Sequence, residues 1–535
     1  MDATKAYDMD AVRRVALSSV TSPRTWILLG AAVGVYFVSI WTYNLLLHPL
    51  AGFPGPKLAA ATRIYEFYYD VIKRGQYVYK IEEMHKKYGP IVRINPYEIV
   101  INDPEFYNDV YVAGNTRRTG IWPRYRTGIG FDDSHTMTEN HELHRRRRKP
   151  LEPFFSRLGI SRMEEMIVAE TSLLNSRLEE MKGSKAVIRL DHVFSAFAGD
   201  VIGRICCETP PSMMKNPDFG KEWQVARANR ENRAATSPVH AHSSTGRIAS
   251  TNGTCSLARI FPTGLLYKIY PGASGFNEFR QMMAQHIVET KRENAEGKHY
   301  DENASNSIFR YIVTSEMPPS EQSVERLSRE AMVLFGAGTA TTARTLGFMC
   351  YYLLRDPAMK KRLTEELAPV MANYPAASPR WAELEKLVYL QAVIKEGLRL
   401  SFGVMRRLPR TAPDVALQYK QWTIPKGTPV GMAAYSLHTD PDVYPEPFRF
   451  VPERWLGAYN PKMDRNWVPF TRGSRNCLGI NLAMAEMNHA MAVMFRPGGP
   501  ALTLYETDES DISQSVDFLM PLPKLDSRGT RVTVE

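Results

Sequence analysis

One cysteine near the C-terminus has neighbours that would make it a good metal ligand. Cys477 lies between Gly473 and Gly479, two residues after Arg475 and seven after Phe470. Apolar residues at helical spacing follow directly, so we expect the thiol at the entrance to a helix. There the positive end of the helix dipole and unpaired N–H groups favour the thiolate, which is a suitable axial ligand for haem iron. The alternative is a buried structural cysteine, the usual state of a free thiol.

The whole pattern, Phe470-x-x-Gly473-x-Arg475-x-Cys477-x-Gly479, resembles the haem-binding loop of the cytochrome P-450 family. This resemblance implies that Cys477 is the axial ligand of haem b (iron protoporphyrin IX) and that Arg475 contacts a haem propionate. The two glycines would let the backbone come close to the flat macrocycle. Phe470 would pack on the ring.

The longest helical pattern runs from Ser323 to Arg355 and holds small residues at its centre. Glycine and threonine inside a helix cost stability and often mark a local distortion. One explanation is a tight contact with another helix. The other is a groove for O2, because Ala337 and Thr341 lie one turn apart on one face. The segment resembles the family's A-G-x-[DE]-T-T pattern, which implies catalytic roles for Ala337, Thr341 and Thr342, with Thr341 donating a hydrogen bond and relaying protons.

Ala340 departs from that pattern, because the family usually has an acid at this position. Proton delivery must then use water, the substrate or another group. The departure also keeps open a haem-thiolate isomerase, a dehydratase or a peroxide-using enzyme.

A basic run covers His144-Arg145-Arg146-Arg147-Arg148-Lys149. Alone, such a run is a solvated helix face, a localisation signal or a nucleic-acid patch. Here His144 and Arg148 are one helical turn apart and resemble the family's C-helix motif, in which the first residue is usually Trp. The resemblance assigns both to haem propionates, as it does Arg410 in Arg407-Leu-Pro-Arg410. The other basic residues would form the proximal surface that meets an acidic reductase, and nucleic-acid binding is the least expected role.

Glu396 and Arg399 can pair across one turn of a helix predicted from about Leu384 to Leu400. Alone, this spacing is a weak signal. Arg454, in Pro-Glu-Arg-Trp, completes a combination found in the family. The resemblance implies a buried network that holds the haem pocket, a structural role, in which losing one partner costs roughly 3–5 kcal/mol.

The composition bounds the class of protein. The chain has 535 residues, 23% charged and 44% hydrophobic, with a net charge of +10. These are globular values, and the basic balance suggests an acidic partner, an anionic membrane surface or nucleic acid. Five cysteines without a spacing framework argue against a disulfide scaffold, and no C-x-x-C zinc pair exists.

An apolar segment from Thr25 to Leu47 has 23 residues without a charge, enough to span a bilayer. It is too long for a signal peptide and lacks a small-residue cleavage site. Prolines follow and should stiffen the connection. We therefore expect an N-terminal tail (1–24), a transmembrane anchor (25–47), a proline-rich hinge (48–57) and a haem-binding catalytic domain (58–535).

The orientation of this anchor is set by two conflicting signals. Lys5, Arg13, Arg14 and Arg24 precede it, so the positive-inside rule alone would leave the N-terminus cytoplasmic. The family resemblance implies the reverse, with the catalytic domain on the cytoplasmic face of the endoplasmic reticulum, and we follow it. Glycosylation signals at Asn252 and Asn303 would then stay unmodified.

Residues 234–257 break the apolar pattern with small polar residues typical of an unstructured loop. Two histidines and a cysteine occur there, without the spacing of a metal site. The segment is a long loop or the product of a gene-model error such as a retained intron.

The resemblance implies a mainly α protein with a minor β part, including strands at Ile91–Ile94 and Glu98–Ile101. Segments such as HPLAGFPGPKLAA resemble fungal secondary-metabolism members, including trichodiene oxygenase. The implied activity is insertion of one oxygen atom from O2 into an apolar scaffold, with a terpenoid expected first and a polyketide second. No credible nucleotide-binding G-x-G-x-x-G is found, so electrons would come from NADPH through a separate cytochrome P-450 reductase. An inactive haem-binding protein remains an alternative.

Overall fold

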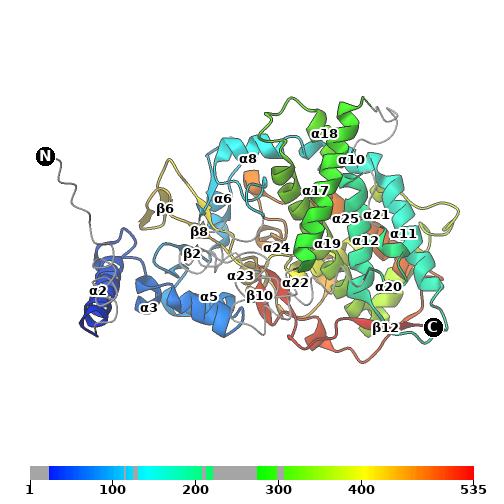
Figure 1. The fold of residues 1–535 in the computed structure, drawn as a ribbon. Helices are drawn as coiled ribbons and strands as arrows, with labels where there is room; N and C mark the ends of the chain where they lie inside the picture. Colours follow the sequence, from blue (N-terminus) through cyan, green and yellow to red (C-terminus); the bar gives the residue numbers. More distant parts are fainter. Residues whose placement is uncertain (1–22, 114–115, 124–130, 208–211, 221–273, 298–306) are drawn as a thin grey trace.

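Helices make up most of the structure (Figure 1), a computed structural model that describes residues 23–113, 116–123, 131–207, 212–220, 274–297 and 307–535. The α-helices are α2 (Pro23–Thr42), α3 (Lys57–Ala61), α4 (Ile64–Phe67), α5 (Tyr77–Tyr88), α6 (Tyr107–Val110), α8 (His141–Arg148), α9 (Glu152–Phe155), α10 (Arg157–Arg162), α11 (Glu164–Glu179), α12 (Leu190–Cys206), α17 (Ser274–Ala295), α18 (Ile308–Thr314), α19 (Val324–Arg355), α20 (Pro357–Leu367), α21 (Trp381–Leu384), α22 (Val388–Ser401), α23 (Ala434–His438), α24 (Lys462–Asn466) and α25 (Ile480–Phe495). This confirms the predicted fold class. The predicted loop at 234–257 and the signals at Asn252 and Asn303 lie outside the described residues.

The strands are short and form small sheets. They are β1 (Ile91–Arg93), β2 (Ile99–Ile101), β3 (Gly120–Ile121), β4 (Ile188–Arg189), β5 (Arg410–Thr411), β6 (Leu417–Tyr419), β7 (Trp422–Ile424), β8 (Val430–Gly431), β9 (Leu502–Leu504), β10 (Val516–Phe518), β11 (Met520–Leu522) and β12 (Arg531–Val534). The largest sheet has the order β1-β2-β8-β5-β3. Its first two strands lie where the sequence predicted strands, and they pair antiparallel, with Ile91 opposite Ile101. Both are fully buried, so their side chains help to fill the core on either face.

Helix α19 crosses the helical part and packs against α12, α17, α22 and α25 (Figure 1). The Ser323 side chain accepts the Arg326 N–H and fixes the start of the helix. The helix is continuous over all 32 residues, with no break at the small residues of its centre. Its middle is nevertheless open: Gly336 and Ala337 are exposed, although most residues on either side of them are buried.

Helix α22 begins at Val388, four residues later than the sequence predicted. A separate turn of helix, α21, ends at Leu384. The Glu366 carboxylate of α20 accepts the N–H groups of Tyr389 (2.7 Å) and Leu390 (2.8 Å). A distant side chain therefore satisfies the free donors at this helix start, which explains why the local pattern placed the boundary wrongly.

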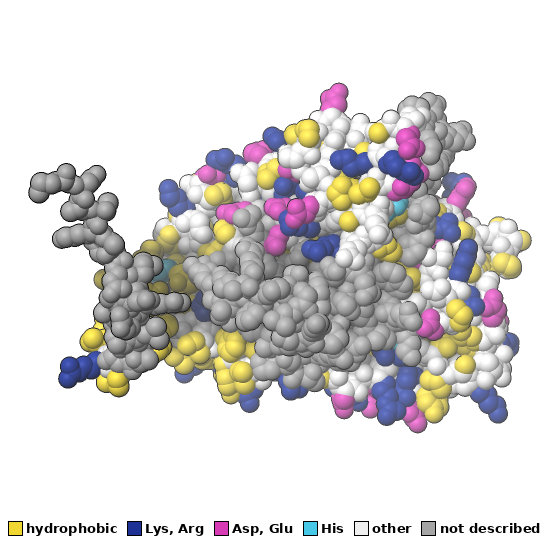
Figure 2. Space-filling view, viewed as in Figure 1, with side chains coloured by type: hydrophobic (Ala, Val, Ile, Leu, Met, Phe, Trp, Pro, Cys, Tyr) yellow, Lys and Arg dark blue, Asp and Glu magenta, His cyan; other side chains and the backbone are white. Residues whose placement is uncertain are grey.

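The N-terminal apolar segment stands at one side of the molecule and has no buried residue in α2 (Figure 1). With a π-helical turn that follows, it spans Pro23–Leu47, 25 residues, long and apolar enough to cross a membrane. The described part of this helix begins at Pro23, two residues before the predicted Thr25. Figure 2 shows hydrophobic side chains gathered around this helix and the adjoining segment, and mixed charges over the helical part.

The end of the anchor is tied to the β part by hydrogen bonds. The side-chain amide of Asn44 donates to the Ala61 carbonyl (2.9 Å). The backbone carbonyl of Asn44 accepts from the Arg93 guanidinium (2.9 Å). Further along the chain, buried Arg407 pairs with Glu66 and Glu98. These contacts fix the anchor end and the sheet relative to each other, since a buried charge must keep its partners.

Candidate active site

The backbone holds the Cys477 thiol in an open space. The backbone N–H of Cys477 donates to the Phe470 carbonyl (2.9 Å), and Gly479 precedes the first residue of α25. The surrounding protein raises the pKa of the Cys477 thiol, while the Gly479 N–H and the Arg148 guanidinium act to lower it. The side chain is nevertheless exposed. A thiol that is enclosed by protein and yet accessible faces an internal space.

The two glycines of the loop differ in what surrounds them. Gly473 has φ +78°, and a Cβ there would collide with the carbonyl oxygens of Tyr111 and Val112. The neighbouring Ser474 N–H donates to Val112 (3.0 Å). The structure thus explains Gly473 by an approach to protein backbone. A Cβ at Gly479 would meet nothing within 4 Å, so this glycine borders open space.

Two of the three expected catalytic residues share a face of α19. Thr341 donates its hydroxyl to the Ala337 carbonyl (2.9 Å), a bond across one turn. The Thr341 carbonyl accepts from Thr345, which also pairs with the Ser401 hydroxyl (2.8 Å). Ala337 is exposed and Thr341 is partly exposed, so this face of α19 is accessible halfway along the helix.

Thr342 lies apart from this pair, on a buried face of α19 beside Glu486 of α25. Glu486 is 1% exposed, and burial raises the pKa of its carboxyl well above its usual range, against the effect of the Thr342 hydroxyl. The sequence analysis missed this carboxyl. The only signal was an acid inside an apolar helical pattern.

Of the four residues predicted to contact propionates, Arg148, Arg410 and Arg475 come together as a cationic cluster, and neutral His144 lies beside them. Burial, followed by the charges of Arg410 and Arg148, lowers the pKa of Arg475 to about 9. Burial, followed by Arg475 and other neighbours that include Arg148 and Arg410, lowers the pKa of His144 to about 2. His144 is 2% exposed, and its Nδ1 has no partner. Like charges placed together in the interior call for an anion.

Protein carbonyls already position part of this cluster. Arg475 donates to the carbonyls of Thr138 (2.6 Å), Glu139 (2.9 Å) and Thr119 (3.1 Å). Arg148 donates to the backbone and side chain of Asn476, the residue before Cys477. The haem loop and helix α8 are therefore locked together.

One residue of the basic run is not on the surface. Arg145, Arg146 and Lys149 are exposed, whereas Arg147 is buried and forms a bidentate pair with Glu321 (2.7 and 3.0 Å). The expectation that all remaining basic residues form a proximal surface is wrong for Arg147. It lies three positions after buried His144, so both share the inward face of α8.

The structural network forms as predicted and is larger. Arg399 pairs with Glu396 through two bonds (2.9 and 2.8 Å), and Arg454 donates to the same carboxylate (2.9 Å). Glu396 also accepts from the Trp455 indole and the Val451 N–H. Both Glu396 and Arg399 side chains are fully buried. A fully satisfied network of this kind fixes one packing arrangement.

His438 links this network to the haem loop. Its Nε2 accepts the Val468 N–H (2.9 Å), so its Nδ1 carries the proton and donates it to the Arg399 carbonyl (2.9 Å). Val468 lies two residues before Phe470. Burial lowers the pKa of His438 to about 3.

The residues present fit a haem on three observations. The Cys477 thiol is accessible inside the protein. The centre of α19 is open at Ala337. The cationic cluster of Arg148, Arg410 and Arg475, with the unpartnered Nδ1 of His144 beside it, calls for carboxylates such as the propionates.

The chain belongs to the cytochrome P-450 family, whose model matches residues 64–497. It is 68% identical over 460 residues to the cytochrome P-450 monooxygenase tndB of Aspergillus flavipes, covering 85% of this chain and 95% of that protein. It is 51% identical over 528 residues to stellatic acid synthase of Emericella variicolor, covering 94% of each. Identity to the fusicoccadiene C-8 hydroxylase of Phomopsis amygdali is 46% over 506 residues, again 94% of each. The chain is a cytochrome P-450 monooxygenase.

Proposed function

We propose that this monooxygenase binds haem b through Cys477 and inserts one oxygen atom from O2 into an apolar terpenoid scaffold of fungal secondary metabolism. The accessible yet enclosed Cys477 thiol is the observation that carries the site assignment. Similarity to stellatic acid synthase and to a fusicoccadiene hydroxylase supports the terpenoid assignment. A polyketide is the second candidate.

Haem, when bound, supplies an iron centre that can activate O2 for insertion into a C–H bond. The chain's own residues prepare this centre. The Gly479 N–H and the Arg148 guanidinium favour the Cys477 thiolate. His144, Arg148, Arg410 and Arg475 hold the propionates.

Thr341 is the residue that relays protons at this site. Its hydroxyl donates to the Ala337 carbonyl (2.9 Å), and its oxygen can still accept a hydrogen bond from water. Turning the hydroxyl outwards breaks one hydrogen bond, a cost of about 1 kcal/mol. Thr342 lies instead on the buried face of α19, beside Glu486.

Electrons come from NADPH through a separate cytochrome P-450 reductase. Arg145, Arg146 and Lys149 are exposed next to the residues that hold the haem loop. A cationic surface at this place favours an acidic partner. Nucleic acid is not expected as a partner, since Arg147 and Arg148 are engaged within the protein.

The anchor places the enzyme on the endoplasmic reticulum membrane with its catalytic domain in the cytoplasm. Residues 25–47 span the bilayer, 48–57 act as the hinge and 58–535 form the catalytic domain. The exposed apolar surface of α2 supports this assignment, since none of the residues of this helix is buried.

Expression together with a reductase, in a host supplied with terpenoid hydrocarbons, tests this function. We expect a product heavier by one oxygen atom, dependent on NADPH and O2, and lost in Cys477→Ala. Product formation without NADPH would indicate an isomerase or dehydratase, and formation with peroxide alone a peroxide-using enzyme. A haem spectrum without turnover of any scaffold would indicate an inactive haem-binding protein.

A further inference from the structure

A buried histidine in the segment before α8 is held by a carboxylate of α19. His135 is 5% exposed, and its ring Nδ1 donates to the Glu330 carboxylate, since an ionised carboxylate can only accept. The backbone N–H of His135 donates to the same carboxylate (3.1 Å). The remaining ring nitrogen, Nε2, pairs with the Thr136 hydroxyl (3.1 Å). Glu330 therefore fixes both the backbone and the ring of His135.

The Glu330 side chain is fully buried, and its charge is compensated. Arg326, one turn earlier on α19, lies 2.7 Å from the Glu330 carboxylate and 3.2 Å from that of Glu321. Glu321 also pairs with Arg147 of α8. Burial alone would raise the pKa of Glu330, but His135 and Arg326 hold it below its usual value. Glu330 is therefore a charged acceptor for His135, and charge-assisted hydrogen bonds are the strong ones.

The same segment presents two backbone carbonyls to the haem loop. The carbonyls of Thr138 and Glu139 accept from Arg475 (2.6 and 2.9 Å). The Thr138 hydroxyl donates to the Ser134 carbonyl (2.7 Å), which closes one turn of chain around His135. Because this turn is short and closed, the place of His135 sets the place of the carbonyls that hold Arg475.

Two buried nitrogen atoms beside this turn have no hydrogen-bond partner among the described residues. They are Nε of Arg475 and Nδ1 of His144, in residues that are 9% and 2% exposed. The centre of the His144 ring lies 6.4 Å from that of His135. Leaving a buried polar nitrogen unpaired is costly, so both atoms should meet an acceptor or donor that the protein itself does not supply.

We propose that Glu330 is a positioning residue for haem: through His135 it holds the turn at 134–139 in place, and this turn aims Arg475 at the haem propionates beside His144. The inference rests on the proposed function, since it adds an outer layer to the same haem site. Groups of this kind orient the residues that touch a cofactor, and losing one at a metal site typically weakens binding by about 10- to 100-fold.

Haem dissociation from the full-length, haem-loaded enzyme measures this role. The ferric protein is mixed with an excess of apomyoglobin, which captures the haem that is released. Glu330→Gln keeps the shape of the side chain, but it removes the charge and replaces one acceptor oxygen by an N–H group. It should raise the rate of haem dissociation by roughly tenfold.

Two variants at His135 test the middle of the connection. His135→Leu removes the ring donor and should release haem as fast as Glu330→Gln does. His135→Asn keeps an N–H donor near the position of Nδ1 and should bring the rate back close to that of the parent. A role in packing alone would give the reverse order, because leucine suits a buried place better than asparagine.

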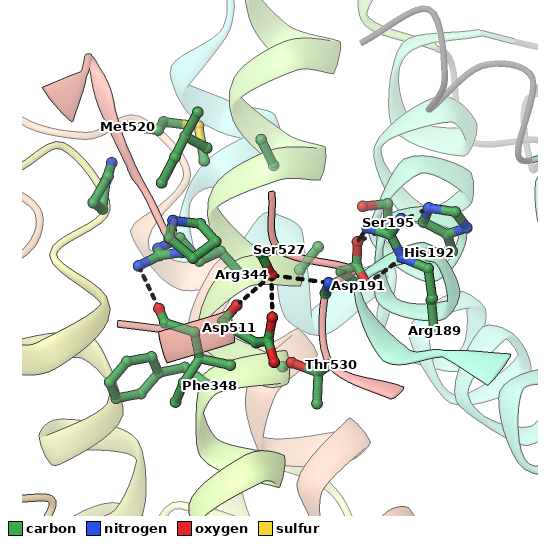
Figure 3. Close-up of a pocket in the computed structure, with 18 of the residues that line it drawn as sticks. Arg189, Asp191, His192, Ser195, Arg344, Phe348, Asp511, Met520, Ser527 and Thr530 are labelled. Atoms are coloured by element: carbon green, nitrogen blue, oxygen red, sulfur yellow. Dashed lines mark hydrogen bonds and ion pairs between the residues drawn. The ribbon is translucent and has the colours of Figure 1, made fainter. Parts of the chain in front are cut away.

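Two acids elsewhere around α19 provide matched controls. Glu325→Gln makes the same change on the exposed face of the helix, where Glu325 pairs with Arg329 (2.6 Å). Asp191→Asn removes a carboxylate at the edge of a cavity that borders α19, where Asp191 pairs with Arg189 (Figure 3). Both variants should keep the haem dissociation rate of the parent.

A further control separates positioning from a general loss of stability. Glu366→Ala weakens the fold at the start of α22 and should release haem at the parent rate. The propionate bending band in the resonance Raman spectrum should shift in Glu330→Gln and His135→Leu and stay in place in Glu366→Ala, because only the first two disturb the partners of the propionates.

Equal rates of haem dissociation in the parent, Glu330→Gln and His135→Leu would overturn the proposal, as would equally fast release from Glu366→Ala. If Glu330→Gln does not yield folded protein, the two His135 variants decide: release from His135→Asn that is no slower than from His135→Leu overturns the proposal. A parent chain without a haem-thiolate band in its carbon monoxide difference spectrum would instead contradict the proposed function, so the two failures are distinguishable.

Discussion

His438 shows how much one buried side chain can determine. Both of its ring nitrogens are used, one on the Arg399 carbonyl and one on the Val468 N–H. Protonation would put a charge in a fully buried place and remove the acceptor for Val468. The folded state therefore requires neutral His438, and the stability of the fold must depend on pH.

The folded-state pKa of His438, about 3, lies below the ordinary value of 6.5. Between these values the unfolded chain binds the extra proton and the folded chain does not. Stability is therefore full above pH 6.5 and falls as pH drops toward 3, by up to about 1.4 kcal/mol per pH unit. In urea unfolding between pH 7 and 5, His438→Gln should give a shallower decline than the parent chain. Equal slopes would contradict this role.

Residue types and spacing predicted part of the site, and tertiary pairing decided the rest. The cluster of His144, Arg148, Arg410 and Arg475 was predicted because each lies in a short motif. The partner of Arg147 was not, because Glu321 is 174 residues away and carries no local signal. Glu486 carried only a weak signal, an acid inside an apolar helical pattern, and its burial follows from the packing of α25 against α19.

Among the helices, α19 and α25 were predictable from apolar spacing, while the start of α22 was not. Its boundary depends on Glu366, 23 residues before Tyr389. Pattern reasoning finds long helices well, because their periodicity repeats. Ends that are capped from another element carry no such signal.

The Glu366 cap gives a direct stability test. Glu366→Ala should lower the free energy of unfolding by about 1–2 kcal/mol, since two N–H groups at the helix start lose their acceptor. Glu365→Ala is the control, because that side chain is exposed and should change stability by less than about 0.5 kcal/mol. Chemical denaturation measures both, and equal effects would refute the cap.

Helix α8 presents two faces with different tasks. Arg147→Gln should lower the free energy of unfolding by roughly 3 kcal/mol, because Glu321 loses its bidentate arginine partner in the interior. Arg146→Gln, on the exposed face, should leave stability unchanged and weaken electron transfer from the reductase, more so at low salt. Denaturation and reductase titrations measure the two effects. The assignment fails if Arg146→Gln destabilises the fold as strongly as Arg147→Gln.

At the scale of the whole molecule, a short connection with its own hydrogen bonds joins the N-terminal apolar helix to the rest of the protein. Asn44 lies at the junction and bonds to Ala61 and Arg93. The sequence predicted the anchor and the stiff prolines. It did not show that the end of the anchor is itself part of the packed body.

Two deletions separate these roles. Removing residues 1–42 should release the protein from membranes and keep its haem spectrum, because the Asn44 contacts remain. Removing residues 1–47 should release it as well, but with a lower melting temperature, since Arg93 loses a buried acceptor. Membrane fractionation and thermal unfolding give the answer. Identical melting temperatures would show that the Asn44 contacts do not stabilise the body.

The ligation of iron by one thiolate is tested most directly by the carbon monoxide difference spectrum of the reduced protein. The full-length chain should show a Soret band at the haem-thiolate position, and Cys350→Ala should keep it. Cys477→Ala should lose it. A band that persists without Cys477, or a parent chain that never shows one, would contradict the account.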